Sequence, residues 1–383
     1  MVLTEHLNPQ QKEAVLHTEG PLLVLAGAGS GKTRVLTYRV AHLIENLKVR
    51  PDNILAITFT NKAAKEMKER IYDLVGSKAE NTWISTFHST CVRILRREIE
   101  KIGFTRNFVI YDTDDQLTLV KDCIKELDLS EKYFNPKDIR YRIGELKDQI
   151  LSPEDYRKEI QGQYREEKIA DIYKLYQDKL SKNNALDFDD LINRTLELFY
   201  LRPDVLDYYS SKFQYILVDE YQDTNYAQYM LVKLLSMKHQ NLCVVGDDDQ
   251  SIYGWRGADI RNILEFEKDF PNTKIIKLEE NYRSTQIILD AANEVIKNNT
   301  GRKEKRLWTE KGQGEKIFVY KVSDERQEAD IICQHIHKHI VSDNKDPGDF
   351  AILYRTNAQS RAIEDALMRY GIPYRMYGGL RFY

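Results

Sequence analysis

Residues 22 to 33 read LLVLAGAGSGKT, an apolar run that passes directly into a glycine-rich loop ending in lysine and threonine. The first five residues have the length and composition of a strand buried on both faces. After the loop, apolar residues recur at helical spacing, at Val35, Leu36, Val40, Leu43 and Ile44. A strand, a glycine-rich loop and a helix in this order predict a phosphate-binding loop.

The chemistry of this loop favours a nucleoside triphosphate with Mg²⁺. Lys32 is expected to reach the β- and γ-phosphates, and the Thr33 hydroxyl to take one position on the metal. The one departure from the G-x-x-x-x-G-K-[ST] pattern is Ala26, which stands at its first glycine. We assign the cofactor contacts of the loop to Ala28, Gly29, Ser30, Gly31, Lys32, Thr33 and Arg34.

A second apolar run, residues 215 to 218, ends in the carboxylates of Asp219 and Glu220. Asp219 can hold Mg²⁺ through water, and Glu220 can orient or deprotonate an attacking water molecule. A strand that ends in two carboxylates as it enters a solvated turn is common. The two carboxylates therefore indicate a metal and catalytic site only because the chain also contains a phosphate-binding loop.

The pattern along the chain predicts an α/β protein with an interrupted parallel sheet. Residues 54 to 59 and 242 to 245 are further strand-like runs, whereas residues 105 to 186 have helical spacing and predict an all-helical insertion. Strands are expected again at residues 317 to 322 and 350 to 354, separated by a helix over residues 325 to 339. The acidic stretch Asp187 to Asp190 is expected to cap a helix.

Composition sets broad limits on the function. A chain of 383 residues predicts two or three domains, and no apolar run approaches the length of a membrane span. The start of the chain lacks the pattern of a secretory signal, so we expect a cytoplasmic protein without a membrane partner. Its four cysteines are far apart and are expected to be reduced. The formal charge of −3 does not indicate nucleic-acid binding, so any such contact must come from local clusters.

Several motifs together resemble those of the superfamily 1A DNA helicases, the family of UvrD, Rep and PcrA. The matching stretches are residues 7–11 (Q motif), 58–64 (motif Ia), 219–223 (extended Walker B), 246–258 (motif III) and 281–285 (motif IV). Residues 354–361, YRTNAQSR, resemble the PcrA branch in particular. The resemblance covers essentially the whole chain.

This resemblance implies a P-loop NTPase fold with a RecA-like parallel sheet domain, an all-helical insertion and the first part of a second RecA-like domain. The implied segments are residues 1–105 and 186–279 for the first domain, 106–185 for the insertion and 280–383 for the second domain. By the same resemblance, the chain stops before the family's later motifs, including its second γ-phosphate arginine. We therefore expect this segment alone to bind nucleotide, to hydrolyse it poorly and not to unwind duplex DNA.

The resemblance also assigns residues around ATP. Gln11 would read the adenine edge, Tyr282 would stack on the base, and Arg283 would contact the γ-phosphate as a catalytic residue beside Lys32 and Glu220. Gln250 would lie near the γ-phosphate and report nucleotide state to the DNA side, whereas Asp248 is expected to be a plain turn former. The alternatives are an exposed glutamine at a helix start, a core-packed Tyr282, and an Arg283 paired with Glu279 or Glu280.

A single-stranded DNA surface requires backbone donors and flat rings on which bases stack. The resemblance and the residue types assign this surface to Phe59, Thr60, Asn61, His88, Tyr253, Trp255, Arg256, Arg355 and Asn357. Packing within a surface cluster is the alternative for a single aromatic residue, and a solvated loop is the alternative for His88, Arg355 and Asn357. The basic run Arg93, Arg96 and Arg97 is expected to be a solvated helix face.

The activity implied by the resemblance is an ATP-dependent 3′–5′ DNA helicase or translocase in DNA repair or replication. Its expected partners are single-stranded DNA, junctions of single- and double-stranded DNA, and the remaining C-terminal half of the helicase, with the chain as a monomer. One alternative is the motor of an AddA- or RecB-type helicase–nuclease. Two others are an ATP-dependent clamp on a partner protein and a small-molecule kinase, against which the aromatic residues in the loops argue.

Overall fold

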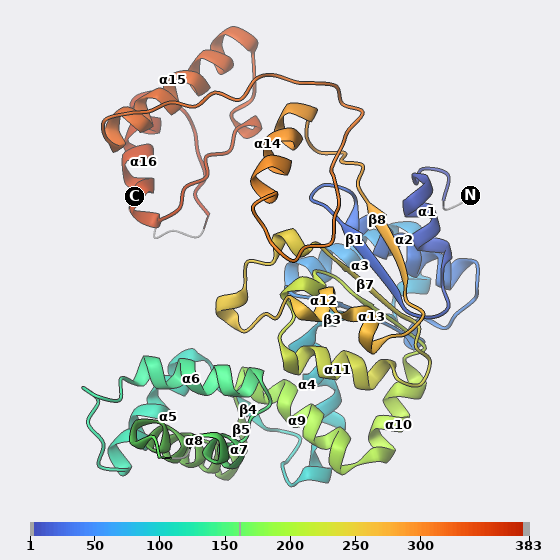
Figure 1. Cartoon of the computed structure of the whole chain (residues 1–383), viewed down its shortest axis with the longest axis vertical. Coiled ribbons are helices and arrows are strands. Elements are labelled where there is room, and N and C mark those ends of the chain that lie inside the picture. Colours follow the sequence, from blue (N-terminus) through green and yellow to red (C-terminus); the bar gives the residue numbers. More distant parts are fainter. Residues whose placement is uncertain (1–3, 161, 378–383) are drawn as a thin grey trace. The chain divides into compact units, whose positions relative to one another are not determined.

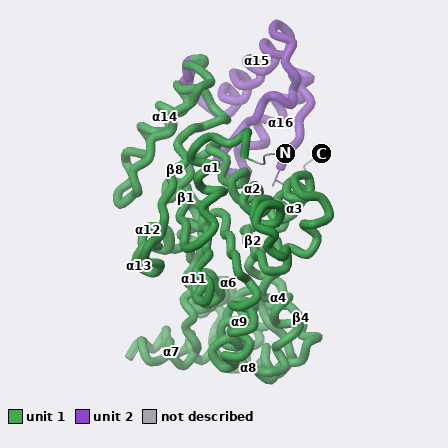
Figure 2. The backbone as a smooth tube through the Cα atoms, turned by 90° about the vertical axis from the view of Figure 1, so that its right-hand side faces the viewer, with its two compact units in different colours: residues 1–315 green, residues 316–383 purple. Residues whose placement is uncertain are grey.

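The computed structural model describes residues 4–160 and 162–377. The described residues form two compact units, one that ends at residue 315 and one that begins at residue 316, which Figure 2 distinguishes by colour. Each unit is described by itself. No described helix combines the length and the apolar character needed to cross a membrane.

A six-stranded parallel sheet forms the centre of the first unit (Figure 1). Its strands are β1 (Leu22–Ala26), β2 (Ile54–Thr58), β3 (Trp83–Thr86), β6 (Tyr215–Val218), β7 (Leu242–Gly246) and β8 (Lys274–Leu278). They lie in the order β3-β2-β6-β7-β1-β8, and every neighbouring pair is parallel. The predicted α/β fold with a parallel sheet is confirmed, whereas β3 and β8 were not expected.

Helices cover both faces of this sheet because the side chains of each strand alternate between the two faces. Leu22 and Val24 of β1 belong to one hydrophobic core, and Leu23 and Leu25 to the other. The first core includes α1 (Pro9–Leu16), α2 (Lys32–Glu45) and α3 (Asn61–Val75). The second includes α4 (Phe87–Glu98), α9 (Phe188–Leu201), α10 (Pro203–Lys212), α11 (Tyr226–Ser236), α12 (Arg261–Leu264) and α13 (Phe266–Asp269).

The segment between β3 and β6 carries a separate helical core. It contains α5 (Thr113–Glu126), α6 (Pro136–Asp148), α7 (Pro153–Glu159) and α8 (Tyr164–Lys182). The expectation that this segment is all-helical was wrong in one detail. The two-residue strands β4 (Val109–Ile110) and β5 (Ala185–Leu186) pair in parallel where the chain leaves the segment and returns. This pairing satisfies backbone groups at the junction.

The acidic stretch after β5 caps a helix, as predicted. The Asp187 side chain accepts from the Asp190 backbone N–H at the start of α9. The Asp190 side chain in turn accepts from the Asp187 backbone N–H. Both carboxylates also contact the buried Lys147 ammonium of α6, at 2.6 Å and 2.9 Å. The cap therefore also ties the helical segment to α9.

The last part of the chain contains α14 (Gln286–Ile296) in the first unit and α15 (Glu325–Asp343) with α16 (Ser360–Arg369) in the second. The predicted helix over residues 325 to 339 is confirmed by α15. The strands predicted over residues 317 to 322 and 350 to 354 were wrong, because these described residues are in no strand. Val319 is 91% exposed and Leu353 is 90% exposed. A strand needs a hydrogen-bonding neighbour, and composition cannot reveal whether one is present.

Candidate nucleotide site and nucleic-acid groove

The loop between β1 and α2 requires glycine at two positions. Gly29 and Gly31 have φ values of 68° and 92°, in the left-handed region. A Cβ atom on Gly31 would lie 2.7 Å from the Gln11 amide nitrogen, and one on Gly29 would lie 2.7 Å from that of Asn281. Gly31 caps α2 without a side-chain hydrogen bond, so the first-turn N–H groups of α2 have no side-chain cap. The start of this helix therefore fits the phosphate groups of a nucleotide.

Gln11 joins helix α1 to this loop. Its side-chain Nε2 donates to the Ser30 carbonyl at 2.9 Å, and its Oε1 accepts from the Asn8 backbone N–H at 3.3 Å. The side chain is fully buried, so the alternative of an exposed glutamine at a helix start is wrong. Its role at the adenine edge stays a prediction, and such contact would require these hydrogen bonds to be exchanged.

Lys32 and Glu220 meet directly, although they are far apart in the sequence. Lys32 Nζ lies 2.8 Å from Glu220 Oε2, and Gln222 Nε2 donates to the same oxygen at 3.0 Å. Glu220 has a left-handed φ of 49° immediately after β6. Burial, and then the charge of Glu220, raise the pKa of Asp219 to about 6. A nearby cation would favour the charged carboxylate, so the position suits a metal ligand.

Gln222 is a residue of this site that the sequence reasoning missed. It is buried, and its Oε1 accepts from the Asp247 backbone N–H at 3.0 Å. Its carbonyl accepts from the Ser251 hydroxyl at 3.2 Å. Gln250 in turn donates to the Asp247 carboxylate. A continuous set of hydrogen bonds therefore leads from Lys32 and Glu220 to the segment that continues to Tyr253 and Trp255.

Three successive aspartates after β7 surround one lysine. Asp247, Asp248 and Asp249 all form ion pairs with Lys305, whose side chain is 3% exposed. Asp249 also pairs with Arg302 at 2.7 Å. The expectation that Asp248 is a plain turn former was wrong, because its side chain is buried in this ion pair. These three carboxylates lie close enough together to hold a metal ion, but the Lys305 ammonium already pairs with all of them.

Motif IV lies against the phosphate-binding loop. The Tyr282 backbone N–H donates to the Gly29 carbonyl at 3.0 Å, and the Asn281 side chain donates to the Ala28 carbonyl at 2.6 Å. The Tyr282 ring is exposed, so the alternative of core packing is wrong. Among the described residues, Arg283 forms no ion pair, which excludes the proposed pairing with Glu279 or Glu280. Its guanidinium is therefore free to contact a phosphate group at the phosphate-binding loop.

Six of the residues assigned to DNA line a single groove in the first unit. They are Phe59, Thr60, His88, Tyr253, Trp255 and Arg256. The groove has a volume of about 560 Å³, and residues of α6 form its other wall. Asn61 is the first residue of α3, next to Thr60. Arg355 and Asn357 belong to the second unit, before α16.

The aromatic residues of the groove differ in accessibility. Trp255 is 60% exposed, and its ring centre lies 6.4 Å from that of Tyr253. The Arg256 guanidinium lies 4.5 Å from the Trp255 ring centre, within cation–π distance. The half-buried Phe59 instead packs edge-on against Phe87. Trp255 and Tyr253 are therefore exposed rings with Arg256 beside them, whereas Phe59 has the packing role of the alternative.

Ionisable groups on the walls of the groove have shifted pKa values. Burial lowers the pKa of His88, which favours its neutral form. Burial raises the pKa of Asp148 to about 7, although a hydrogen bond from Asn225 opposes the shift. Burial and neighbouring carboxylates raise the pKa of Asp189 well above its ordinary value. Protonation of these carboxyl groups would reduce the negative charge of the groove walls.

The glycine-rich loop after β1, the helix that follows it and the carboxylates after β6 define a P-loop protein. The chain belongs to the UvrD-like helicase family, because a model described as the UvrD/REP helicase N-terminal domain matches residues 7–271. A second model, the UvrD-like helicase C-terminal domain, matches residues 276–383. The resemblance seen in the motifs is thereby confirmed.

The chain is also similar in sequence to individual curated proteins. The ATP-dependent DNA helicases PcrA of Staphylococcus aureus strain NCTC 8325 and Bacillus subtilis strain 168 are each 57% identical over 381 residues. The alignments cover 100% of this chain, 52% of the first relative and 51% of the second. The chain thus spans about half the length of the curated relatives it matches.

Proposed function

We propose that this chain carries the ATP-binding and single-stranded DNA-binding parts of a 3′–5′ DNA helicase that acts in DNA repair or replication. The observation that carries the proposal is the set of hydrogen bonds from Lys32 and Glu220 through Gln222 to the segment before Trp255. Such a connection can make the grip on DNA depend on nucleotide, which a motor requires. The identity to proteins named ATP-dependent DNA helicase PcrA supports this function over that of a helicase–nuclease.

Each group at the nucleotide site has a defined task in the proposal. Bound ATP with Mg²⁺ supplies a phosphoanhydride bond that water can cleave. Lys32 and the N–H groups at the start of α2 bind phosphate oxygens, and Arg283 adds a guanidinium beside them. Thr33 and Asp219 hold the metal. Glu220, once released from Lys32, accepts the proton of the attacking water.

The groove supplies the DNA grip. Stacking of a base on an aromatic ring contributes about 1–3 kcal/mol and tolerates any sequence. Trp255 and Tyr253 provide such rings, with Arg256 beside them. Partners in the proposal are single-stranded DNA, its junctions with duplex and the remaining C-terminal half of the helicase, and the working form is a monomer.

The assignments can be tested by substitution in this 383-residue chain. Lys32→Ala should abolish binding of a fluorescent ATP analogue and leave single-stranded DNA binding in place. Trp255→Ala should weaken DNA binding roughly tenfold, in line with the loss of one stacked base, and leave nucleotide binding unchanged. The matched control is Tyr133→Ala, which removes an exposed aromatic ring outside the groove. Equal DNA affinity of the Trp255→Ala and Tyr133→Ala variants would contradict the proposal.

The chain alone is further expected to hydrolyse ATP slowly and not to unwind duplex DNA. Measurement of ATPase with and without single-stranded DNA tests this expectation. A DNA-stimulated rate of about 1–10³ s⁻¹, typical of intact enzymes, would contradict it.

A further inference from the structure

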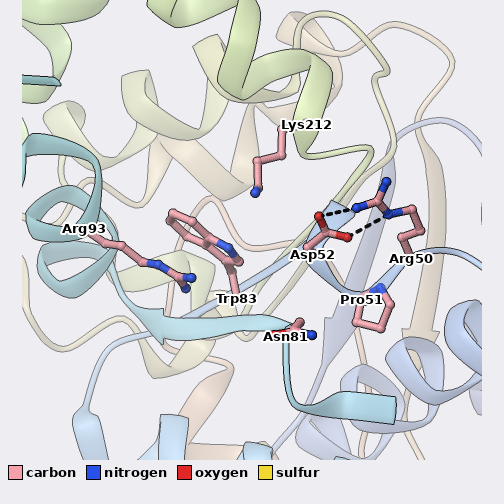
Figure 3. A pocket seen from close by; sticks show the side chains of 7 residues that line it. All are labelled: Arg50, Pro51, Asp52, Asn81, Trp83, Arg93 and Lys212. Atoms are coloured by element: carbon pink, nitrogen blue, oxygen red, sulfur yellow. Dashed lines mark hydrogen bonds and ion pairs between the residues drawn. The ribbon is translucent and has the colours of Figure 1, made fainter. Parts of the chain in front are cut away.

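A second pocket lies at the edge of the sheet opposite to the nucleotide site. Arg50 and Pro51 precede β2, Asn81 precedes β3, and Lys212 precedes β6. The amino ends of parallel strands meet at one edge, whereas the phosphate-binding loop follows the carboxyl end of β1. Figure 3 shows the side chains that line this pocket, which is named the Trp83 pocket after its aromatic wall. Its volume is about 360 Å³.

Cations gather around the indole ring in this pocket. The Arg93 guanidinium lies 3.6 Å from the Trp83 ring centre, and Lys212 Nζ lies 5.4 Å from it. Trp83 is 2% exposed, so it forms a wall and offers no open face for a stacked base. The expectation that Arg93 belongs to a plain solvated face is therefore incomplete, because its guanidinium is fixed over this ring. Arg97 lies farther from the same ring, at 6.0 Å.

Two of these cations have no anionic partner. Among the described residues, neither Arg93 nor Lys212 has a carboxylate within 4.0 Å or a hydrogen bond from its side chain. The one carboxylate that lines the pocket, Asp52, is held by Arg50 Nε at 3.1 Å and Nη2 at 3.0 Å. Three cations and one carboxylate leave the lining with a net charge of +2 (3 − 1).

The pKa values of Lys212 and Arg93 are both lowered by partial burial and by neighbouring cations. Burial is the largest cause that lowers the pKa of Lys212, and Arg97, Arg93 and Arg50 lower it further, against the opposing charge of Asp52. Burial and then Arg97 lower the pKa of Arg93. The cations of the pocket therefore repel one another, and a bound anion would offset this repulsion.

We propose that the Trp83 pocket binds a phosphate monoester or pyrophosphate group. A dianionic oxyanion matches the net charge of the lining, and its tetrahedral oxygens suit guanidinium, ammonium and amide donors that come from two helices and two loops. The donors are Arg93 and Lys212, with the Asn81 amide and the Asp52-paired Arg50 beside them. Such a group is present on small phosphorylated molecules and on the 5′-phosphorylated end of a DNA strand. The site is independent of the ATP site and of the proposed function.

Binding can be measured by isothermal titration calorimetry in phosphate-free buffer. The Lys32→Ala variant serves as the background, so that the loop after β1 does not contribute. The probes are inorganic pyrophosphate and a short DNA duplex with or without 5′-phosphates. We expect pyrophosphate affinity to fall roughly tenfold or more when Arg93→Gln and Lys212→Gln are added to this background. The control pair is Arg157→Gln with Lys238→Gln, two cations that already hold Asp171 and Asp207.

The two sources of the phosphate group give different results. If DNA ends are the ligand, 5′-phosphorylated duplex binds more tightly than the 5′-hydroxyl duplex, and the double substitution at the pocket removes the difference. If small molecules are the ligand, only pyrophosphate binding responds to that substitution. Either result supports the proposal. Equal affinities for both probes with and without Arg93→Gln and Lys212→Gln, or no binding of either probe, would overturn it.

A second measurement needs no ligand. Since the pocket holds like charges against their repulsion, Lys212→Gln should raise the melting temperature of the ligand-free chain, whereas the control Lys238→Gln should not. A melting temperature lowered by Lys212→Gln would show that the cation stabilises the fold by itself. That result would overturn the argument that the cations of the pocket repel one another and that a bound anion relieves this repulsion.

Discussion

At the scale of single residues, the glycines of the phosphate-binding loop connect sequence to geometry most directly. The pattern of the loop predicted phosphate binding, and the structure shows which atoms a side chain at its glycines would collide with. Gly31 has a positive φ and faces the Gln11 amide, whereas Gly20 has a similar φ of 81° with open space around it. A side chain at Gly20 would therefore meet backbone strain alone, whereas one at Gly31 would meet both strain and a steric collision.

Gly31→Ala should therefore destabilise the chain more than Gly20→Ala does. Both substitutions strain the backbone, but the collision with Gln11 adds roughly 1–3 kcal/mol at Gly31. Urea unfolding of both variants measures the difference. Equal losses of unfolding free energy would show that the loop moves away from Gln11 at little cost.

Asp148 predicts a pH dependence of stability. Its pKa is raised from the ordinary value of 3.8 to about 7 by burial, so the folded chain keeps a proton that the unfolded chain has lost. The stability from this group is complete below 3.8 and is lost as the pH rises through about 7. Asp148→Asn should flatten the fall in melting temperature between the unfolded pKa of 3.8 and the folded pKa of about 7. The exposed Asp138→Asn variant of the same helix should fall like the unsubstituted chain.

A steep fall that persists in the Asp148→Asn variant would assign the dependence to another group. Asp189, which also lines the groove and has a raised pKa, would then be the next residue to test.

Several site residues could be predicted from local sequence, and others could not. Lys32, Asp219 and Glu220 stand in short patterns whose chemistry is readable without a structure. Gln222 and Lys305 depend on partners that are distant in the chain, and a glutamine or a lysine alone has no distinctive pattern. Sequence reasoning therefore picked out the residues of the candidate site but missed the buried Gln222, which bonds to Glu220, and Lys305, which pairs with the aspartates after β7.

At the scale of elements, apolar runs predicted strands well only where the strands are central. The continuous runs of β1, β2, β6 and β7 were recognised because both of their faces are buried. The edge strands β3 and β8 were missed, since they contain serine, threonine or lysine among their apolar residues. The runs at residues 317 to 322 and 350 to 354 have the right composition but no neighbouring strand.

The contact between α6 and α9 depends on a buried charge. Lys147 lies between Asp187 and Asp190, and all three side chains are buried. Lys147→Met should cost about 3–5 kcal/mol of unfolding free energy, because two carboxylates are left without their cation. The control is Lys158→Met at an exposed ion pair. Similar unfolding midpoints in urea for the two variants would contradict this role of Lys147.

At the scale of the whole molecule, the sheet brings the two functional regions together within one unit. The nucleotide loop follows β1, the carboxylates follow β6, and the segment with Trp255 follows β7, which lies between those two strands. Their carboxyl ends meet at one edge, as the parallel sheet predicted. The domain boundaries at residues 105, 185 and 280 stay predictions.

The central claim is that nucleotide and DNA binding are coupled through Gln222. The most direct test is the affinity for a fluorescent single-stranded oligonucleotide, measured by anisotropy with and without a non-hydrolysable ATP analogue. We predict that the analogue changes this affinity by about 5–150-fold in the unsubstituted chain and in the exposed control Gln163→Ala, but hardly at all in Gln222→Ala. An undiminished response in a folded Gln222→Ala variant would contradict the claim.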